Sequence, residues 1–220
     1  MKRVIVFLCV GALSITLLLR ASTTTTTAQQ PASDYTPVTD ERLRNPAPDD
    51  WLTYRRTYDG WGYSPLDQID ADNVADLVPV WSFSTGVNSG HEAPAIVNDG
   101  VMFVTTPGNQ VIAIDARTGD LIWLYEHEMP EDVIGFHYTN RGVALFGDKV
   151  FMATLDARIV ALDAATGEVV WSESVADNSS GYYMTLAPLT ARGKVMVGVS
   201  GGELGIRGFV VALDTAGKVR

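Results

Sequence analysis

A 13-residue pattern that recurs 48 residues later constrains the fold of this chain more than any other feature of the sequence. Residues 111–123 read VIAIDARTGDLIW and residues 159–171 read IVALDAATGEVVW, so six positions are identical. A third copy begins at 195–197 and resumes at 211–214. A period in the forties, with four short strand-like runs per unit, is typical of a β-propeller.

Each copy contains the residues that a pair of strands requires. The apolar runs 101–105 and 111–114 are rich in β-branched side chains, and Pro-Gly-Asn at 107–109 separates them. This order predicts strand, turn and strand. A shorter run at 78–81 is expected to form an earlier strand. Because the sequence shows no long amphipathic helical pattern, we expect an all-β chain.

The end of each copy predicts how neighbouring sheets stack. Asp115 can accept hydrogen bonds from backbone N–H groups in the following turn, and Gly119 can adopt a positive φ. Trp123 then presents a large flat apolar surface to a neighbouring sheet. We expect Trp171 and Trp81 to dock in the same way.

The first 28 residues are predicted to be a secretory signal peptide. A basic start at 1–3 precedes an apolar run of 16 residues at 4–19, and cleavage is expected near Ala21 or Ala28. An uncleaved anchor is the alternative, and it would be the chain's only contact with a membrane, although a spanning helix needs about 20 apolar residues. Residues 29–48, rich in polar residues and proline, are expected to be a flexible lead-in to a domain at 49–220.

Charge and cysteine content exclude several classes of function. Lys and Arg number 16 against 26 Asp and Glu, so the net charge of −10 gives no electrostatic reason to bind nucleic acid. The single cysteine, Cys9, excludes an internal disulfide and a Cys-rich zinc or iron–sulfur site. No Gly-x-Gly-x-x-Gly follows a strand and no Gly-x-Ser-x-Gly occurs, so nothing indicates an NAD-type oxidoreductase or a serine hydrolase.

An insertion in the third copy points to a functional loop. This copy starts 45 residues after the second, yet Asp214 lies 51 residues after Asp163, which leaves six extra residues between 199 and 210. Insertions in repeat proteins fall in loops, usually on the functional face. The insert includes Ser-Gly-Gly-Glu at 200–203, where adjacent glycines permit close approach to a ligand and a carboxylate suits a hard cation. A solvated turn with an incidental glutamate is the alternative.

The complete motif resembles a known family. Ala-x-Asp-x-x-Thr-Gly-x-x-x-Trp, intact at 113–123 and 161–171, is similar to the tryptophan-docking motif of the quinoprotein dehydrogenases. These are eight-bladed propellers that use pyrroloquinoline quinone (PQQ) and usually Ca²⁺. Further similar stretches lie at 63–69, 140–144, 185–188 and 200–209. The periplasmic alcohol dehydrogenases of the methanol and ethanol type are the group that this chain resembles most.

The resemblance implies an incomplete propeller. About three of eight blades and part of the closing blade are expected within the chain, which would make it the N-terminal part of a longer periplasmic enzyme. The family's catalytic base, an Asp, its Asn metal ligand and the Trp beneath PQQ belong to later blades, beyond Arg220. We therefore expect residues 1–220 alone to be inactive.

The resemblance also assigns the inserted loop. Ser200, Gly201 and Gly202 match residues that touch the quinone, and Glu203 matches a Ca²⁺ ligand. The metal could also be a lanthanide, and the sequence leaves this choice open.

Three residues from other loops complete the implied cofactor site. Arg141 matches an arginine that lies against the quinone oxygens, where a permanently charged donor fork can stabilise developing negative charge. Glu92 matches an early acidic contact with PQQ, and Thr185 matches a hydroxyl donor to a PQQ carboxylate. The alternatives are a surface ion pair, an exposed turn glutamate and a structural threonine.

One segment departs from the family pattern. Many of these alcohol dehydrogenases carry two adjacent cysteines shortly before the arginine, whereas this chain has Gly135 and Phe136 there, followed by His137. The disulfide that packs on PQQ therefore cannot form. In the membrane glucose dehydrogenase branch a histidine takes over this packing, so we expect His137 to stack on the quinone, with Phe136 as the alternative. His137 could instead be a partly buried loop histidine.

The implied reaction oxidises an alcohol to a carbonyl compound. Hydride passes from the substrate to the quinone, Ca²⁺ acts as a Lewis acid, and a base takes the hydroxyl proton. A small alcohol or polyol is the implied substrate, and a cytochrome c or a quinone is the implied electron acceptor; whether a haem c domain follows stays open. The rival interpretations are a non-catalytic propeller that acts as an outer-membrane assembly scaffold, which needs no glutamate after Ser-Gly-Gly, and a sugar-binding propeller.

Overall fold

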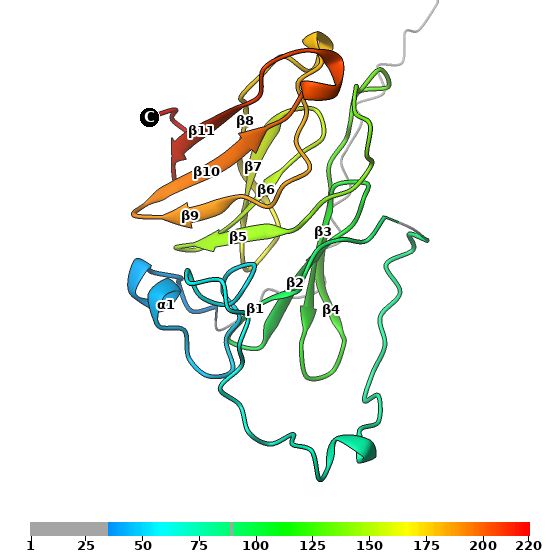
Figure 1. Ribbon diagram of the computed structural model, residues 1–220, viewed down its shortest axis with the longest axis vertical. Coiled ribbons are helices and arrows are strands. Elements are labelled where there is room, and N and C mark those ends of the chain that lie inside the picture. The colour runs from blue at the N-terminus through cyan, green and yellow to red at the C-terminus, as the bar shows by residue number, and fades with distance from the viewer. Residues whose placement is uncertain (1–34, 89) are drawn as a thin grey trace, which may run out of the picture.

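Short antiparallel strands make up almost all of the regular structure. The computed structural model describes residues 35–88 and 90–220 (Figure 1). Its elements are the helix α1 (Asp40–Arg44), the strands β1 (Ile96–Asn98), β2 (Val101–Thr105), β3 (Gln110–Asp115), β4 (Leu121–Glu126), β5 (Val143–Phe146), β6 (Lys149–Ala153), β7 (Arg158–Asp163), β8 (Val169–Ser174), β9 (Leu189–Ala191), β10 (Lys194–Val199) and β11 (Phe209–Asp214), and the 3₁₀ turns Val74–Asp76, Asn178–Ser180 and Gly202–Leu204.

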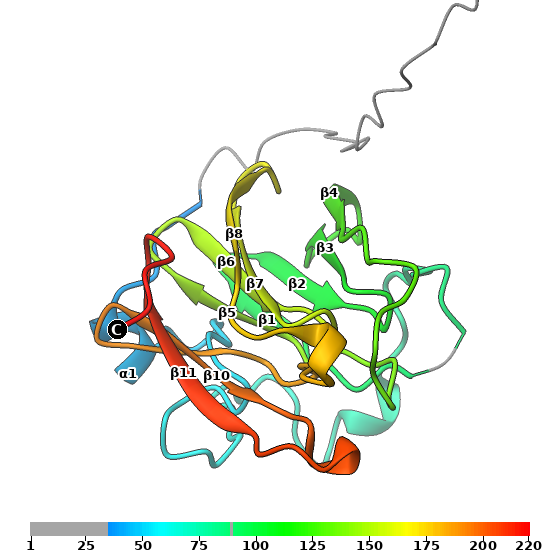
Figure 2. The same cartoon turned by 90° about the horizontal axis from the view of Figure 1, so that it is seen from above.

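The strands form three separate sheets in chain order. β1 to β4 make one four-stranded sheet, β5 to β8 make a second, and β9 to β11 make a three-stranded sheet. Every neighbouring pair is antiparallel and consecutive in sequence, so each sheet is a simple meander. Seen from above, the three sheets stand side by side like segments of a fan (Figure 2). This arrangement confirms the predicted all-β, partial propeller fold.

The repeated Asp–Gly turn forms as predicted. The carboxylate of Asp115 accepts hydrogen bonds from the backbone N–H groups of residues 117 and 118, and Asp163 does the same for residues 165 and 166. The glycines that close these two turns, Gly119 and Gly167, have φ values of 78° and 75°. An L-residue at either position would be strained, which explains the glycine in the motif.

Each motif tryptophan docks on the turn of the next repeat. The indole N–H of Trp123 donates to the carbonyl of Ala164 over 3.0 Å, and that of Trp171 donates to Thr215 over the same distance. The ring of Trp123 lies so close to Gly167 that a Cβ there would stand 2.6 Å from it. Close approach and positive φ thus both require glycine, and this contact joins one blade to the next.

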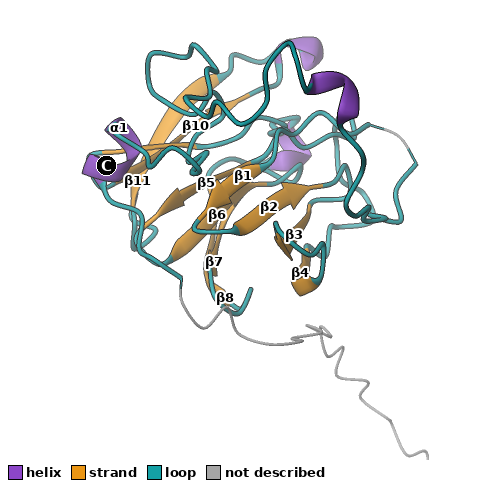
Figure 3. Cartoon of the chain, turned by 90° about the horizontal axis from the view of Figure 1, so that it is seen from below, coloured by secondary structure: helices purple, strands orange, loops and turns teal. Residues whose placement is uncertain are grey.

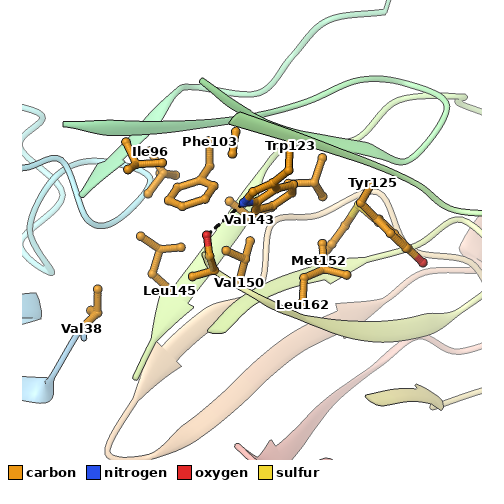
Figure 4. Packing of buried hydrophobic residues seen from close by; sticks show 14 of the residues in the cluster. Val38, Ile96, Phe103, Trp123, Tyr125, Val143, Leu145, Val150, Met152 and Leu162 are labelled. Atoms are coloured by element: carbon orange, nitrogen blue, oxygen red, sulfur yellow. Dashed lines mark hydrogen bonds between the residues drawn. The ribbon is translucent and has the colours of Figure 1, made fainter. Parts of the chain in front are cut away.

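Two apolar cores lie between the sheets. Figure 4 shows the first, where Trp123 packs beside Phe103 and against Val150, with its hydrogen bond drawn as a dashed line. The ring centroids of Phe103 and Trp123 are 5.8 Å apart and tilted by 46°. The second core repeats this arrangement with Phe151 and Trp171, also 5.8 Å apart. The same contacts therefore recur at each junction between blades.

The predicted strand at 78–81 does not form. Trp81 docks as expected, with its indole N–H 3.2 Å from the Ala116 carbonyl. However, Val78 and Val80 are 75% and 86% exposed, and Figure 3 draws this segment as a loop. No strand among the described residues lies beside it, so its backbone has no ladder to join.

The described part of the expected lead-in packs into the fold. Val38 and Leu43 are fully buried in the first core, and the backbone of Val38 exchanges two hydrogen bonds with Gly147. Residues 35–48 therefore differ from the flexible segment that their polar composition suggests, because these two apolar side chains fix it. The expected signal peptide at 1–28 lies outside the described residues. Within the described ranges, no helix has the length and apolar character needed to cross a membrane.

A largely buried polar cluster links the first two sheets. The Nε2 of His127 lies 3.0 Å from Asp156, its Nδ1 lies 3.2 Å from the hydroxyl of Tyr125, and the His127 and Asp156 side chains are both 8% exposed. Burial raises the pKa of Tyr125 to about 12, so its phenol stays protonated. Burial also raises the pKa of Asp156, but hydrogen bonds from His127 and Thr154 outweigh this and hold that pKa below its ordinary value.

We expect Asp156→Asn to destabilise the protein by roughly 1–3 kcal/mol at pH 7, the usual cost of unpairing a buried polar group. Because the native pKa of Asp156 is depressed, the stabilisation is complete above the unfolded pKa of about 4 and is lost as the pH falls further. Urea denaturation between pH 7 and pH 3 should show the difference from wild type shrinking below pH 4. Asp67→Asn, at an exposed position, is the control. If the difference in stability between wild type and Asp156→Asn stayed constant down to pH 3, the ionised form of the Asp156 carboxylate would not be the source of the stabilisation.

Candidate functional site

The predicted site residues lie at one end of the sheets. Arg141 and Thr185 each lie a few residues before the first strand of their sheets, β5 and β9, and Glu92 has the same place before β1. The loop 200–203 follows β10, which runs antiparallel to β9, so the end of β10 adjoins the start of β9. Repeated topology therefore brings loops that are distant in sequence to one edge, as Figure 1 shows.

Arg141 lies between Glu92 and Thr185. Its Nη2 is 2.8 Å from a carboxylate oxygen of Glu92, and its Nη1 donates to the Thr185 hydroxyl over 2.5 Å. The backbone N–H of Arg141 also donates to the Thr185 carbonyl over 3.0 Å. The Arg141 side chain is 32% exposed, so the guanidinium is held in place but still reaches solvent. It can offer its remaining N–H groups to an anionic ligand.

Asn140 fixes the backbone that carries Arg141. It is 1% exposed, and its amide donates to Asn109 and to the Ala153 carbonyl over 3.0 and 2.9 Å. Its side-chain oxygen accepts from the N–H of Gly142. Sequence reasoning placed this asparagine in the similar stretch 140–144 but gave it no role. A strongly polar residue beside an apolar strand was the available signal, because such a side chain is buried only with its hydrogen bonds satisfied.

The two adjacent glycines of the inserted loop serve different purposes. A Cβ on Gly201 would lie 2.3 Å from the side chain of Ile206 and 3.0 Å from the Gly181 carbonyl, so packing within the protein requires this glycine. A Cβ on Gly202 would meet nothing within 4 Å. Only Gly202 therefore has open space beside it for a ligand. Ser200 is paired with Tyr183 through backbone hydrogen bonds of 2.9 and 3.2 Å.

Glu203 is an exposed carboxylate on the 3₁₀ turn Gly202–Leu204. One of its oxygens accepts a hydrogen bond from the Tyr183 hydroxyl over 2.9 Å. A bond from its own backbone N–H, the Tyr183 bond and the positive field of His137 hold the pKa of Glu203 below its ordinary value. The group is therefore ionised at neutral pH, as a metal ligand must be. No group of three or more His, Cys, Asp or Glu capable of holding a metal gathers among the residues that the structure describes.

Tyr183 is the residue that sequence reasoning missed. Its side chain is 2% exposed, and burial together with the Glu203 bond raises the pKa of its phenol. Its position two residues before Thr185 was the only signal, since alternate residues of an extended segment share a face.

His137 lies in an exposed stretch between two exposed aromatic residues. Phe136 is 54% exposed and Tyr138 is 55% exposed, and His137 is itself exposed rather than partly buried. The rings of Phe136 and His137 are thus both accessible for stacking on a planar ligand.

An open hollow of about 470 Å³ adjoins the site at Glu92. Trp51, Tyr54, Arg55 and His91 line it, and Arg141 does not. Of the predicted site residues, Glu92 alone reaches it. The hollow therefore lies beside the group formed by Arg141, Glu92 and Thr185, and it reaches that group only at Glu92.

The chain matches an established protein family over most of its length. The family model described as "PQQ: Glucose/ethanol/alcohol dehydrogenase, beta-propeller domain" matches residues 51–203. The quinoprotein alcohol dehydrogenase PedH of Pseudomonas putida is 40% identical over 179 residues, which cover 80% of this chain and 30% of that protein. The quinoprotein ethanol dehydrogenase of Pseudomonas aeruginosa is 44% identical over 161 residues, which cover 69% of this chain and 26% of that protein.

A solved structure agrees with these relatives. A europium-containing methanol dehydrogenase superposes with a TM-score of 0.77 at 38% identity, over 82% of this chain and 32% of that one. The chain thus spans about a third or less of the length of these three proteins. It belongs to the PQQ-dependent quinoprotein alcohol dehydrogenase family, and its three sheets are blades of that family's β-propeller.

Proposed function

We propose that this protein oxidises a small alcohol or polyol to a carbonyl compound, with PQQ and a cation bound at the edge formed by Arg141, Thr185 and the loop 200–203. The observation that carries the proposal is the position of Arg141. Its guanidinium is fixed by Glu92 and Thr185 while it stays 32% exposed, beside a loop that ends in an ionised carboxylate. A fixed cation and a separate metal-binding carboxylate are what an anionic quinone cofactor requires.

The side chains present fit such a cofactor. Arg141 would donate to the quinone oxygens, and the Thr185 hydroxyl would donate to a carboxylate of the cofactor. Ser200, Gly201 and Gly202 would line its edge, with Gly202 offering the open approach. Bound PQQ would supply the electron-accepting chemistry, and Arg141 would stabilise the negative charge that develops on the acceptor. His137 would cover one face of the ring, with Phe136 as the alternative.

Glu203 would provide a carboxylate for the cation. Ca²⁺ takes six to eight oxygen ligands, so one carboxylate needs the help of the cofactor and of further protein groups. The metal would be Ca²⁺ or a lanthanide, and the europium-containing relative supports the second possibility. We propose that the base that takes the substrate proton lies outside residues 1–220, and that a cytochrome c or a quinone accepts the electrons. We also place the protein in the periplasm, delivered by a signal peptide at 1–28.

The Glu203→Gln variant tests this function. Intact wild-type protein, meaning residues 1–220 together with the later propeller blades that the proposal places beyond them, should oxidise alcohols in a dye-linked assay when it is loaded with PQQ and Ca²⁺ or La³⁺. Glu203→Gln should raise the cation concentration for half-maximal activity on the order of 100-fold, because it removes a charged ligand.

Glu168→Gln, at an exposed turn position, is the matched control and should behave as wild type. Two results would count against the proposal: wild-type protein without PQQ-dependent oxidation of any alcohol tested, or a Glu203→Gln variant whose cation requirement is unchanged.

A further inference from the structure

Tyr183 connects the inserted loop, which carries Glu203, to the residues that hold Arg141. Its backbone pairs with Ser200 at the start of the inserted loop, and its hydroxyl donates to Glu203, three residues further along that loop. Two residues further along, the carbonyl and hydroxyl of Thr185 accept hydrogen bonds from Arg141. The segment 183–185 therefore touches both the proposed metal ligand and the proposed anion-binding arginine.

Apart from the bond from its own backbone N–H, Glu203 has little else to hold its carboxylate. It is exposed on a three-residue 3₁₀ turn with Gly201 before it and Gly205 after it. Backbone hydrogen bonds close the turn itself, whereas an exposed glutamate side chain samples several rotamers. The Tyr183 hydroxyl is the one side-chain donor to Glu203 that the described residues provide. Since the tyrosine ring is buried, its hydroxyl is held by the packed core.

The direction of this hydrogen bond suits a metal ligand. An ionised carboxylate only accepts hydrogen bonds, whereas a protonated phenol has one O–H to donate. The Tyr183 bond and the bond from the backbone N–H of Glu203 occupy two of the roughly four lone pairs of the carboxylate, so about two are left for a cation. Hydrogen bonds of this kind orient metal ligands, and their loss typically weakens metal binding 10- to 100-fold.

We propose that Tyr183 is a positioning residue that pre-orients the Glu203 carboxylate for the cation. The inference rests on the proposed function, because it takes Glu203 as a ligand. Tyr183 itself contacts neither cation nor cofactor. Its contribution acts through Glu203 and therefore appears in cation affinity.

The Tyr183→Phe variant tests the inference, because it removes the hydroxyl and keeps the ring. Intact protein, at a PQQ concentration that saturates it, is titrated with Ca²⁺ by calorimetry and, separately, with Eu³⁺ by its luminescence. Tyr183→Phe should bind both ions at least 10-fold more weakly. Tyr182→Phe is the matched control: the neighbouring ring packs against Phe209, and the variant should bind within two-fold of wild type.

A double-mutant cycle separates positioning from a general structural effect. In a Glu203→Gln background, Tyr183→Phe should cause no further loss of cation affinity. An equal loss in both backgrounds would overturn the inference, since Tyr183 would then act without Glu203.

The outcomes distinguish the inference from the proposed function. If Glu203→Gln binds cations as wild type does, both fail. If Glu203→Gln binds weakly while Tyr183→Phe binds normally, the inference alone fails. Should Tyr183→Phe melt far below wild type, near-UV difference spectra on adding Ca²⁺ to wild type and to Glu203→Gln replace it as the test. A tyrosine signal that wild type shows and Glu203→Gln lacks supports the inference. No tyrosine signal in either protein overturns it.

Discussion

Trp123→Ala is expected to destabilise the protein by about 3–5 kcal/mol, the range for truncating a large buried aromatic side chain. Trp123 is 1% exposed, packs on Phe103, and lies against Gly167 of the next blade. The substitution leaves a cavity between two blades and also removes the indole donor to the Ala164 carbonyl. Denaturant unfolding of the intact protein, followed by far-UV circular dichroism, measures the loss.

Trp61→Ala is the matched control for this prediction. The Trp61 side chain is 79% exposed, so its truncation should change stability by less than about 0.5 kcal/mol. If Trp123→Ala and Trp61→Ala both lowered the free energy of unfolding by the same small amount, Trp123 would not stabilise the packing of one blade on the next.

Arg141→Lys should lower kcat on the order of 100- to 1,000-fold, the usual loss when a donor to developing negative charge is removed. Lysine keeps the charge but lacks the planar fork with which Arg141 reaches Glu92 and Thr185 at once. The side chain is partly exposed, so the melting temperature should change little. Steady-state kinetics with a dye acceptor, at saturating PQQ and cation, measures the effect.

The control for this prediction is Arg117→Lys, which changes an exposed arginine on a distant turn and should leave kcat unchanged. If the Arg141→Lys variant kept the kcat of wild type, the guanidinium would be part of a surface ion pair and would take no part in the reaction.

The fold could be predicted where the sequence repeats itself. Asp115, Gly119 and Trp123 recur with fixed spacing, and each has one local physical reason, so the turns and the docking follow directly. Prediction failed where the structure depends on distant partners. The run 78–81 has strand-like residues but no neighbour to pair with, and Val38 is buried because Gly147 and the first core lie beside it.

The candidate site shows the same division. Arg141, Thr185 and Glu203 lie in motifs that resemble a family, so the sequence was enough to select them. Their connection through Tyr183 depends on the antiparallel register of β9 and β10 and on a backbone pair between residues 183 and 200. Tyr182 and Tyr183 are adjacent and chemically identical in sequence, and only burial and the bond to Glu203 distinguish them.

Equilibrium binding of PQQ to the intact protein, with and without Ca²⁺ or La³⁺, tests most directly whether this edge of the blades is a cofactor site. We expect one PQQ per chain, bound tightly only with the cation present, and weakened at least 10-fold by either Arg141→Lys or Glu203→Gln. PQQ binding that is independent of the cation and the same in both variants would place the cofactor, if it binds at all, somewhere other than beside Arg141 and Glu203.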